Sequence, residues 1–143
     1  MSRAPNDEHM PWHIGAALAA WLLPGLGHYL IGERQRGLII GITIMVLWLA
    51  GLFIGGVSVI DTSAAWQWFI AQGCMAPSWL TNFYVQGARG TEGFEASFGR
   101  VAEQGILYTA MAGLLNVLAI IDVAYREPSE DMTHHLAEEG DAP

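Results

Sequence analysis

The stretch LPGLGHYLIGERQRG, Leu23–Gly37, interrupts an apolar chain with a proline, several glycines, a histidine and a short charged turn. Pro24 has no amide hydrogen, and its ring clashes with the carbonyl of Ala20, so we expect a helix to kink or break there. Gly25 and Gly27 then allow a neighbouring backbone to approach closely. The stretch therefore predicts a sharp change of direction in a tightly packed helical protein.

Three apolar runs lie around and after this stretch, over residues 12–31, 38–57 and 104–125, and a polar turn at 32–37 separates the first two. A helix of about 20 apolar residues is long enough to span the hydrocarbon core of a bilayer. We therefore expect an all-α integral membrane protein with three transmembrane helices. The first two should form a tight hairpin, and the third should pack against it.

The composition favours a membrane protein. Hydrophobic residues make up 52% of the chain and charged residues only 14%, and the mean hydropathy is +0.33. Soluble domains carry about 25% charged residues. The net charge of −8 argues against nucleic-acid binding, which depends on basic patches.

Region 58–100 lies between the second and third runs and is neither clearly spanning nor clearly polar. Its segments AAWQWFIAQ and PSWLTNFYVQG are rich in aromatic residues, which prefer the headgroup level of a membrane. We expect one or two short interfacial helices there, with Pro77 in the first turn of the second helix. A re-entrant segment near 64–86 is the alternative, and glycine-rich 87–100 is expected to be a loop.

Both ends of the chain are polar. Segment 1–11 lacks the features of a signal peptide, and segment 127–143 is acidic and predicted to be disordered. Arg34 and Arg36 lie in the shortest loop, where the positive-inside bias is most informative. This bias predicts that the turn and the acidic tail are cytoplasmic and that the N-terminal segment is outside.

Small residues recur at four-residue spacing in the second run, at Gly37 and Gly41 and again at Gly51 and Gly55. This spacing is typical of helices that pack closely in membranes. It favours either tight packing within the chain or association with another membrane helix.

Several polar residues are expected near one membrane face. An ionisable group at membrane depth is costly and usually faces a partner inside the bundle, so Asp122 should pair with Arg34 or Arg36. Arg126, one turn later, is a competing partner. Asn116 should lie about 9 Å deeper and bond near the proline break. The candidate cluster, either a structural latch or a site for a lipid headgroup, proton or ion, is Pro24, Gly25, Gly27, His28, Arg34, Arg36, Asn116 and Asp122.

No motif for a cofactor or a catalytic site is evident: GxSxG, HExxH, P-loop and GxGxxG patterns do not occur. Cys74 is the single cysteine, so no intrachain disulfide can form. His13 and His28 would be about 22 Å apart on one helix, which disfavours a haem between facing histidines. His134 and His135 lie in the acidic tail and favour a solvated segment over a metal site. We expect no cofactor, no metal and no enzymatic activity.

Two segments resemble a known family. LLPGLGHYLIGERQRGLIIGI carries a PGLGH-x-x-x-G-x-x-x-RG signature distantly similar to TM2-domain hairpins, and EQGILYTAMAGLLNVLAIIDVAYR is similar to a second signature. Together they resemble DUF6677, a family of uncharacterised bacterial membrane proteins of the planctomycete type, over residues 12–57 and 103–126. The resemblance implies an inner-membrane protein and brings no catalytic residues. The positions that it singles out are Pro24, Gly25, Gly27, His28, Gly32, Arg36, Gly37, Asn116 and Asp122.

The leading functional hypothesis is a non-enzymatic accessory or assembly subunit, or an oligomeric membrane scaffold. Its partners would be the lipid bilayer and either other membrane subunits or further copies of the chain. The alternative is a small lipid- or ion-handling protein that uses the His28–Arg36–Asp122 region. A membrane enzyme is a third and weaker hypothesis.

Overall fold

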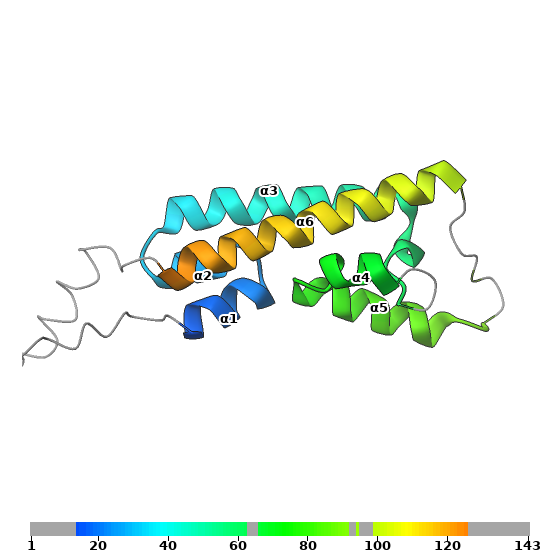
Figure 1. Ribbon diagram of the computed structural model, residues 1–143, viewed down its shortest axis with the longest axis horizontal. Coiled ribbons are helices and arrows are strands. Elements are labelled where there is room, and N and C mark those ends of the chain that lie inside the picture. The colour runs from blue at the N-terminus through cyan, green and yellow to red at the C-terminus, as the bar shows by residue number, and fades with distance from the viewer. Residues whose placement is uncertain (1–13, 63–65, 92–93, 95–98, 126–143) are drawn as a thin grey trace, which may run out of the picture.

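The computed structural model describes residues 14–62, 66–91, 94 and 99–125, and every regular element in these ranges is helical (Figure 1). The all-α expectation is therefore confirmed for the described part of the chain. The expectations for segment 1–11, His13, Arg126 and the tail 127–143 fall outside these ranges.

Two long helices, α3 (Arg34–Gly55) and α6 (Gly99–Tyr125), lie side by side along the length of the molecule (Figure 1). Their backbones meet at glycines: a Cβ atom on Gly105 would stand 2.6 Å from the Cα atom of Gly55. Side chains would hold the helices apart there, so close contact depends on the small residues. Both helices are long and apolar enough to cross a membrane.

The break predicted at Pro24 in the first apolar run is confirmed, but the run does not form a transmembrane helix over 12–31. It forms two short helices, α1 (Ile14–Leu22) and α2 (Leu26–Leu30), separated by Pro24 and by Gly25 at a φ of 84°. The proline ends the first helix, and the left-handed glycine lets the chain fold back beside it. With nine residues, α1 is about 14 Å long, roughly half a bilayer core. Three transmembrane helices are therefore not confirmed, and two of the described helices qualify.

Two further short helices, α4 (Trp66–Gln72) and α5 (Ala76–Ala88), form a second hairpin at the opposite end of the molecule (Figure 1). Short helices in this region and Pro77 in the first turn of α5 are confirmed. The end of α4 reaches the middle of α6, where a Cβ atom on Gly113 would stand 2.0 Å from the carbonyl oxygen of Ala71.

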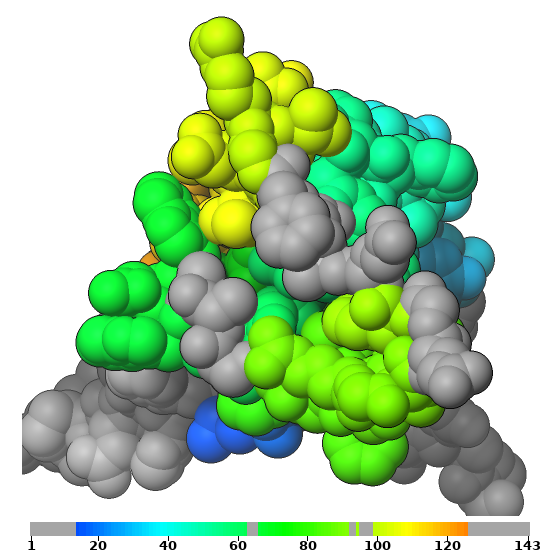
Figure 2. Space-filling model, turned by 90° about the vertical axis from the view of Figure 1, so that its right-hand side faces the viewer, coloured from blue at the N-terminus to red at the C-terminus, as the bar shows by residue number. Residues whose placement is uncertain are grey.

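The second hairpin runs in about the same direction as the long helices, and α4 packs against α6 (Figure 1). The interfacial and the re-entrant interpretations of this region both stay predictions. A short 3-10 helix, Val57–Val59, leads into the hairpin from the end of α3. Seen along the long axis, α4 and α5 lie below the end of α3 and the start of α6 (Figure 2).

The main core lies where α3 and α6 meet the second hairpin. Its large buried side chains include Trp48 from α3, Ile60 after the 3-10 helix, and Phe69 and Met75 from the hairpin. Phe69 also packs edge-on against Trp79, with the ring centroids 5.1 Å apart. A smaller cluster around Ala20 and Val123 fixes the first hairpin to α6. The fold is thus a pair of long helices with one helical hairpin packed on each half.

Candidate functional site

A polar cluster forms where α2, α3 and the end of α6 meet. The Nε2 atom of His28 lies 2.8 Å from Oδ2 of Asp122, and Nη2 of Arg36 lies 3.3 Å from the same oxygen. One carboxylate oxygen therefore stands between two basic side chains from different helices. The predicted pairing of Asp122 with an arginine of the turn is confirmed for Arg36.

Burial divides this cluster into an inner and an outer part. The side chain of His28 is fully buried, whereas those of Asp122 and Arg36 are 37% and 48% exposed. An ionised carboxylate can only accept, so Nε2 of His28 donates this hydrogen bond. The Nδ1 atom of His28 is buried and has no hydrogen-bond partner. Arg36 and Asp122 are therefore accessible to a ligand, and the buried His28 holds the Asp122 carboxylate in position through its hydrogen bond.

Two of the predicted cluster residues lie elsewhere. The guanidinium of Arg34 stands over the ring of Tyr29, with its carbon 5.4 Å from the ring centroid, in a cation–π contact. The amide nitrogen of Asn116 donates to the carbonyl of Cys74 at 3.0 Å, so its predicted bond near the proline break is wrong. The reason is tertiary: the α4–α5 turn occupies the space beside Asn116, and the break lies against α3.

The proline and the glycines of the opening stretch are packing residues. A Cβ atom on Gly25 would stand 2.0 Å from the carbonyl oxygen of Gly37, and one on Gly27 would stand 2.4 Å from that of Ala16. A Cβ atom on Gly41 would stand 2.5 Å from the carbonyl oxygen of Pro24. These contacts hold the first hairpin against α3 and thereby bring His28 to Asp122.

An apolar groove begins at the exposed side of the cluster. It lies between α3 and α6 and has a volume of about 320 Å³. Thr43 in its wall donates its hydroxyl to the carbonyl of Ile39 at 2.8 Å, so the hydroxyl is satisfied within α3. From Arg36 to Ile44 the groove extends roughly 12 Å along the helix. Its lining residues are Arg36, Ile39, Ile40, Thr43, Ile44, Leu115, Leu118, Ala119 and Asp122.

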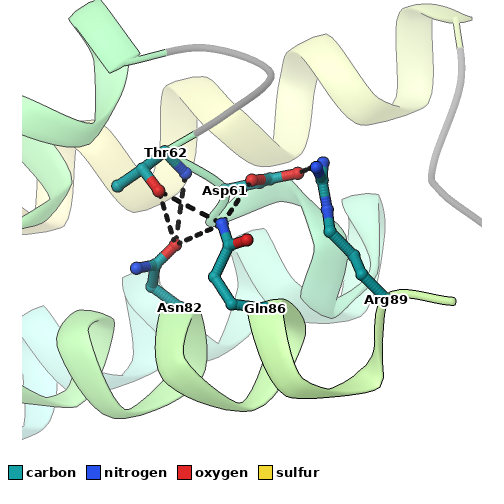
Figure 3. Close-up of polar contacts among 5 residues, drawn as sticks. All are labelled: Asp61, Thr62, Asn82, Gln86 and Arg89. Carbon is teal, nitrogen blue, oxygen red and sulfur yellow. Dashed lines mark hydrogen bonds and ion pairs between the residues drawn. The ribbon is translucent and has the colours of Figure 1, made fainter.

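A second polar cluster, which the sequence reasoning missed, lies at the other end of the molecule (Figure 3). Asp61 is 4% exposed and accepts from the side chain of Gln86 at 3.0 Å and from the guanidinium of Arg89. Asn82, one turn before Gln86 on α5, accepts from the backbone N–H of Thr62 at 3.2 Å. The network ties α5 to the segment that follows α3. The only sequence signal was an acid just after an apolar run and an arginine 28 residues later.

A third group of polar contacts surrounds the tip of the α4–α5 hairpin. The carbonyl of Gly73 accepts from the indole N–H of Trp79 at 2.8 Å and from that of Trp21 at 3.4 Å. Beside it, Gln72 donates to the hydroxyl of Thr109 at 2.8 Å and to the carbonyl of Val59 at 3.2 Å. These bonds satisfy the carbonyl of Gly73 and the amide nitrogen of Gln72 within the protein, whereas Oδ1 of Asn116, at the same tip, is buried without a hydrogen-bond partner.

Metal binding has no clear basis in the described ranges, where no three His, Cys, Asp or Glu side chains gather at one place. The chemistry available at the first cluster is instead the binding of a polar group by a guanidinium and a carboxylate.

The fold and these sites define a class: a small all-helical protein with two helices long and apolar enough to cross a membrane. The chain belongs to DUF6677, a family of unknown function, whose model matches residues 15–134. This confirms the resemblance to this family seen in the sequence. No curated protein and no solved structure matches the chain.

Proposed function

We propose that the chain is an integral membrane protein in which α3 and α6 cross the bilayer and the two short hairpins enter from opposite faces. The outward faces of the long helices support this proposal: Phe53 is 88% exposed, Ile39 64% and Leu118 63%. Apolar faces of this extent would drive aggregation in water and are stable against lipid chains. The bacterial inner membrane is the membrane that we propose, with the 32–37 turn on the cytoplasmic side because of Arg34 and Arg36.

We further propose that the protein works by binding a membrane lipid, without catalysis. The observation that carries this proposal is a pair of opposite charges, Arg36 and Asp122, at one end of an apolar groove. A lipid has the matching form, a polar headgroup joined to apolar chains. His28, buried behind Asp122, keeps the carboxylate turned toward this end of the groove.

Association with other membrane subunits, the leading hypothesis from the sequence, has less support. It was motivated by the small residues of the second apolar run. Gly37 and Gly41 pack against the first hairpin, and Gly51 and Gly55 pack against α6. Because the fold uses these residues internally, they do not favour a partner helix. Partner proteins are therefore an alternative outcome of the experiment below.

The test is native mass spectrometry of the tagged protein after gentle detergent extraction from its own membrane. We expect one lipid per chain, lost in Arg36→Gln and retained in Arg34→Gln, which removes the same charge two residues earlier. A stoichiometric membrane protein in the complex, with no retained lipid, would overturn lipid binding in favour of a subunit role.

A further inference from the structure

The polar end of the groove presents both signs of charge to a ligand. Arg36 and Asp122 share the contact at 3.3 Å, and both side chains are more than one-third exposed. Glu33 lies beyond Arg36, with its Oε2 atom 4.0 Å from Nε, so the arginine is not an isolated positive charge. A purely anionic headgroup would meet the guanidinium but would also be repelled by the two carboxylates. A headgroup that carries one negative and one positive charge would meet a partner for each.

We propose that the groove binds a phospholipid with a zwitterionic headgroup that ends in a primary amine, that is, a phosphoethanolamine lipid. This inference rests on the proposed lipid-binding function and names the class of lipid. The phosphate lies on the guanidinium of Arg36, the ammonium lies on the carboxylate of Asp122, and part of one acyl chain lies along the groove.

The hydrogen-bonding capacities of the groups fit this assignment. A guanidinium has five N–H donors and binds phosphate in a two-pronged geometry, so its contact with Asp122 leaves donors for a phosphate. A carboxylate accepts at about four lone-pair positions, and the side chain of Asp122 is 37% exposed beside its contacts with His28 and Arg36, so an ammonium can reach it from the groove. A primary ammonium has three donors for such a carboxylate.

The groove discriminates against a quaternary amine in two ways. A trimethylated ammonium has no N–H to donate to Asp122. Proteins that bind it usually do so with aromatic rings, through cation–π contacts. The residues that line the groove include aliphatic side chains, a threonine and the two charged residues, but none with an aromatic ring. We therefore expect phosphocholine lipids to bind more weakly than phosphoethanolamine lipids.

The position and size of the groove suit one lipid at a membrane surface. Arg36 is the third residue of α3, and Asp122 lies in the last turn of α6, so both charges stand at the same end of the two long helices. The groove extends from there toward the middle of the molecule, as an acyl chain does from its headgroup. Its volume of about 320 Å³ lies at the lower end of the range for small-molecule sites, about 300–1,000 Å³, which matches part of one chain.

The experiment is a headgroup competition with the full chain. The protein is exchanged into micelles that contain equimolar phosphatidylethanolamine, phosphatidylcholine and phosphatidylglycerol with identical acyl chains, and the retained lipid is measured by native mass spectrometry. We expect the ethanolamine lipid to be retained about tenfold over each of the others, the ratio expected from one charge-assisted hydrogen bond. This measurement needs no variant and so does not depend on a substitution that alters folding.

Two variants and a control identify the residues. Asp122→Asn should bring the ratio of ethanolamine to choline lipid close to one while total lipid is retained. Arg36→Gln should lower the retention of all three lipids, because each has a phosphate. Arg34→Gln should leave both the ratio and the total unchanged. Thermal unfolding in the same detergent checks that each variant is folded.

The outcomes separate the inference from the function on which it rests. Equal retention of the three lipids, or a preference for phosphatidylglycerol, would overturn the headgroup assignment and leave lipid binding in place. Retention of none of the lipids by the folded wild-type protein would overturn both.

Discussion

The two helical hairpins of this protein are held in place by different means. The turn of the first, at Pro24–Gly25, packs its backbone directly against Gly37 and Gly41 of α3. The turn of the second, at Gly73–Met75, has its carbonyls bonded by side chains from α1, α5 and α6. The first turn therefore depends on the absence of side chains, and the second depends on the presence of particular ones.

This difference predicts how each hairpin responds to substitution. Backbone packing tolerates no added atom, because a helix backbone cannot move out of the way. Hydrogen bonds to a carbonyl can be lost one at a time, since a carbonyl has two lone pairs and a neighbouring donor can compensate in part. Substitutions at the first turn should thus be severe, and those at the second should be graded.

The largest effect is expected for Gly25→Ala. The new Cβ atom would clash with the Gly37 carbonyl at 2.0 Å, and alanine would be strained at a φ of 84°. We expect a loss of about 4 kcal/mol in the free energy of unfolding, or failure to accumulate in the membrane. Gly15→Ala, on the same hairpin with no atom within 4 Å of the new Cβ, is the control and should be neutral or slightly stabilising. A folded, wild-type-like Gly25→Ala protein would contradict the backbone contact.

A smaller loss is expected for Asp122→Arg, which places a third basic side chain beside His28 and Arg36. We expect the protein level in the membrane to fall markedly, because the new side chain repels the two basic groups that the carboxylate attracted. The loss in the free energy of unfolding should be roughly 2 kcal/mol, since the carboxylate is partly exposed and its ion pairs are partly screened by solvent. Quantitative immunoblotting of membranes measures this level. The same change at exposed Glu103 is the control, and equal levels for the two variants would show that Asp122 does not hold the first hairpin.

Asn116→Leu sharpens the comparison at the second hairpin. Leucine fills a similar space but leaves the Cys74 carbonyl without its donor at mid-molecule. We expect a loss of about 1–2 kcal/mol, measured by thermal unfolding in detergent. Asn82→Leu, in the middle of α5, should cost less because Asn82 is only partly buried. If the two cost the same, depth within the molecule does not set the strength of these bonds.

The smallest effect is expected for Trp79→Phe, which removes the shorter of the two indole bonds to Gly73. The Trp21 indole remains at 3.4 Å, and a phenyl ring can keep the edge contact with Phe69. A decrease of about 0.5–1 kcal/mol in the free energy of unfolding should result. Trp66→Phe, at a residue 63% exposed, serves as the control. A loss as large as that of Gly25→Ala would remove the distinction between the hairpins.

Hydropathy was enough to place the long helices. The runs at 38–57 and 104–125 correspond to α3 at Arg34–Gly55 and α6 at Gly99–Tyr125, because helical length and apolar content are local properties. In the run at 12–31 the break at Pro24 was predicted but the fold-back was not, since the composition equals that of a spanning helix and the fold-back depends on the backbone angle of Gly25.

The polar contacts show the same limit. Asp122 and Arg36 could be paired because both were expected at one membrane face, where few other charges compete. Asn116 and Asp61 could not be placed, since their partners lie in or after the α4–α5 hairpin, whose position depends on long-range packing. The groove between α3 and α6 arises only when the two helices pack, so no single segment indicates it.

The fold-back at Gly25 also decides whether the proposed membrane protein crosses the bilayer an even or an odd number of times. The start of α1 and the end of α6 lie at the same end of the long helices (Figure 1), and in the proposed topology α1 and α2 together would not add a crossing. With two crossings in place of three, both ends of the described chain would emerge in one compartment, whereas three helices would separate them. Reporter domains fused to the two ends would therefore report the same side of the membrane.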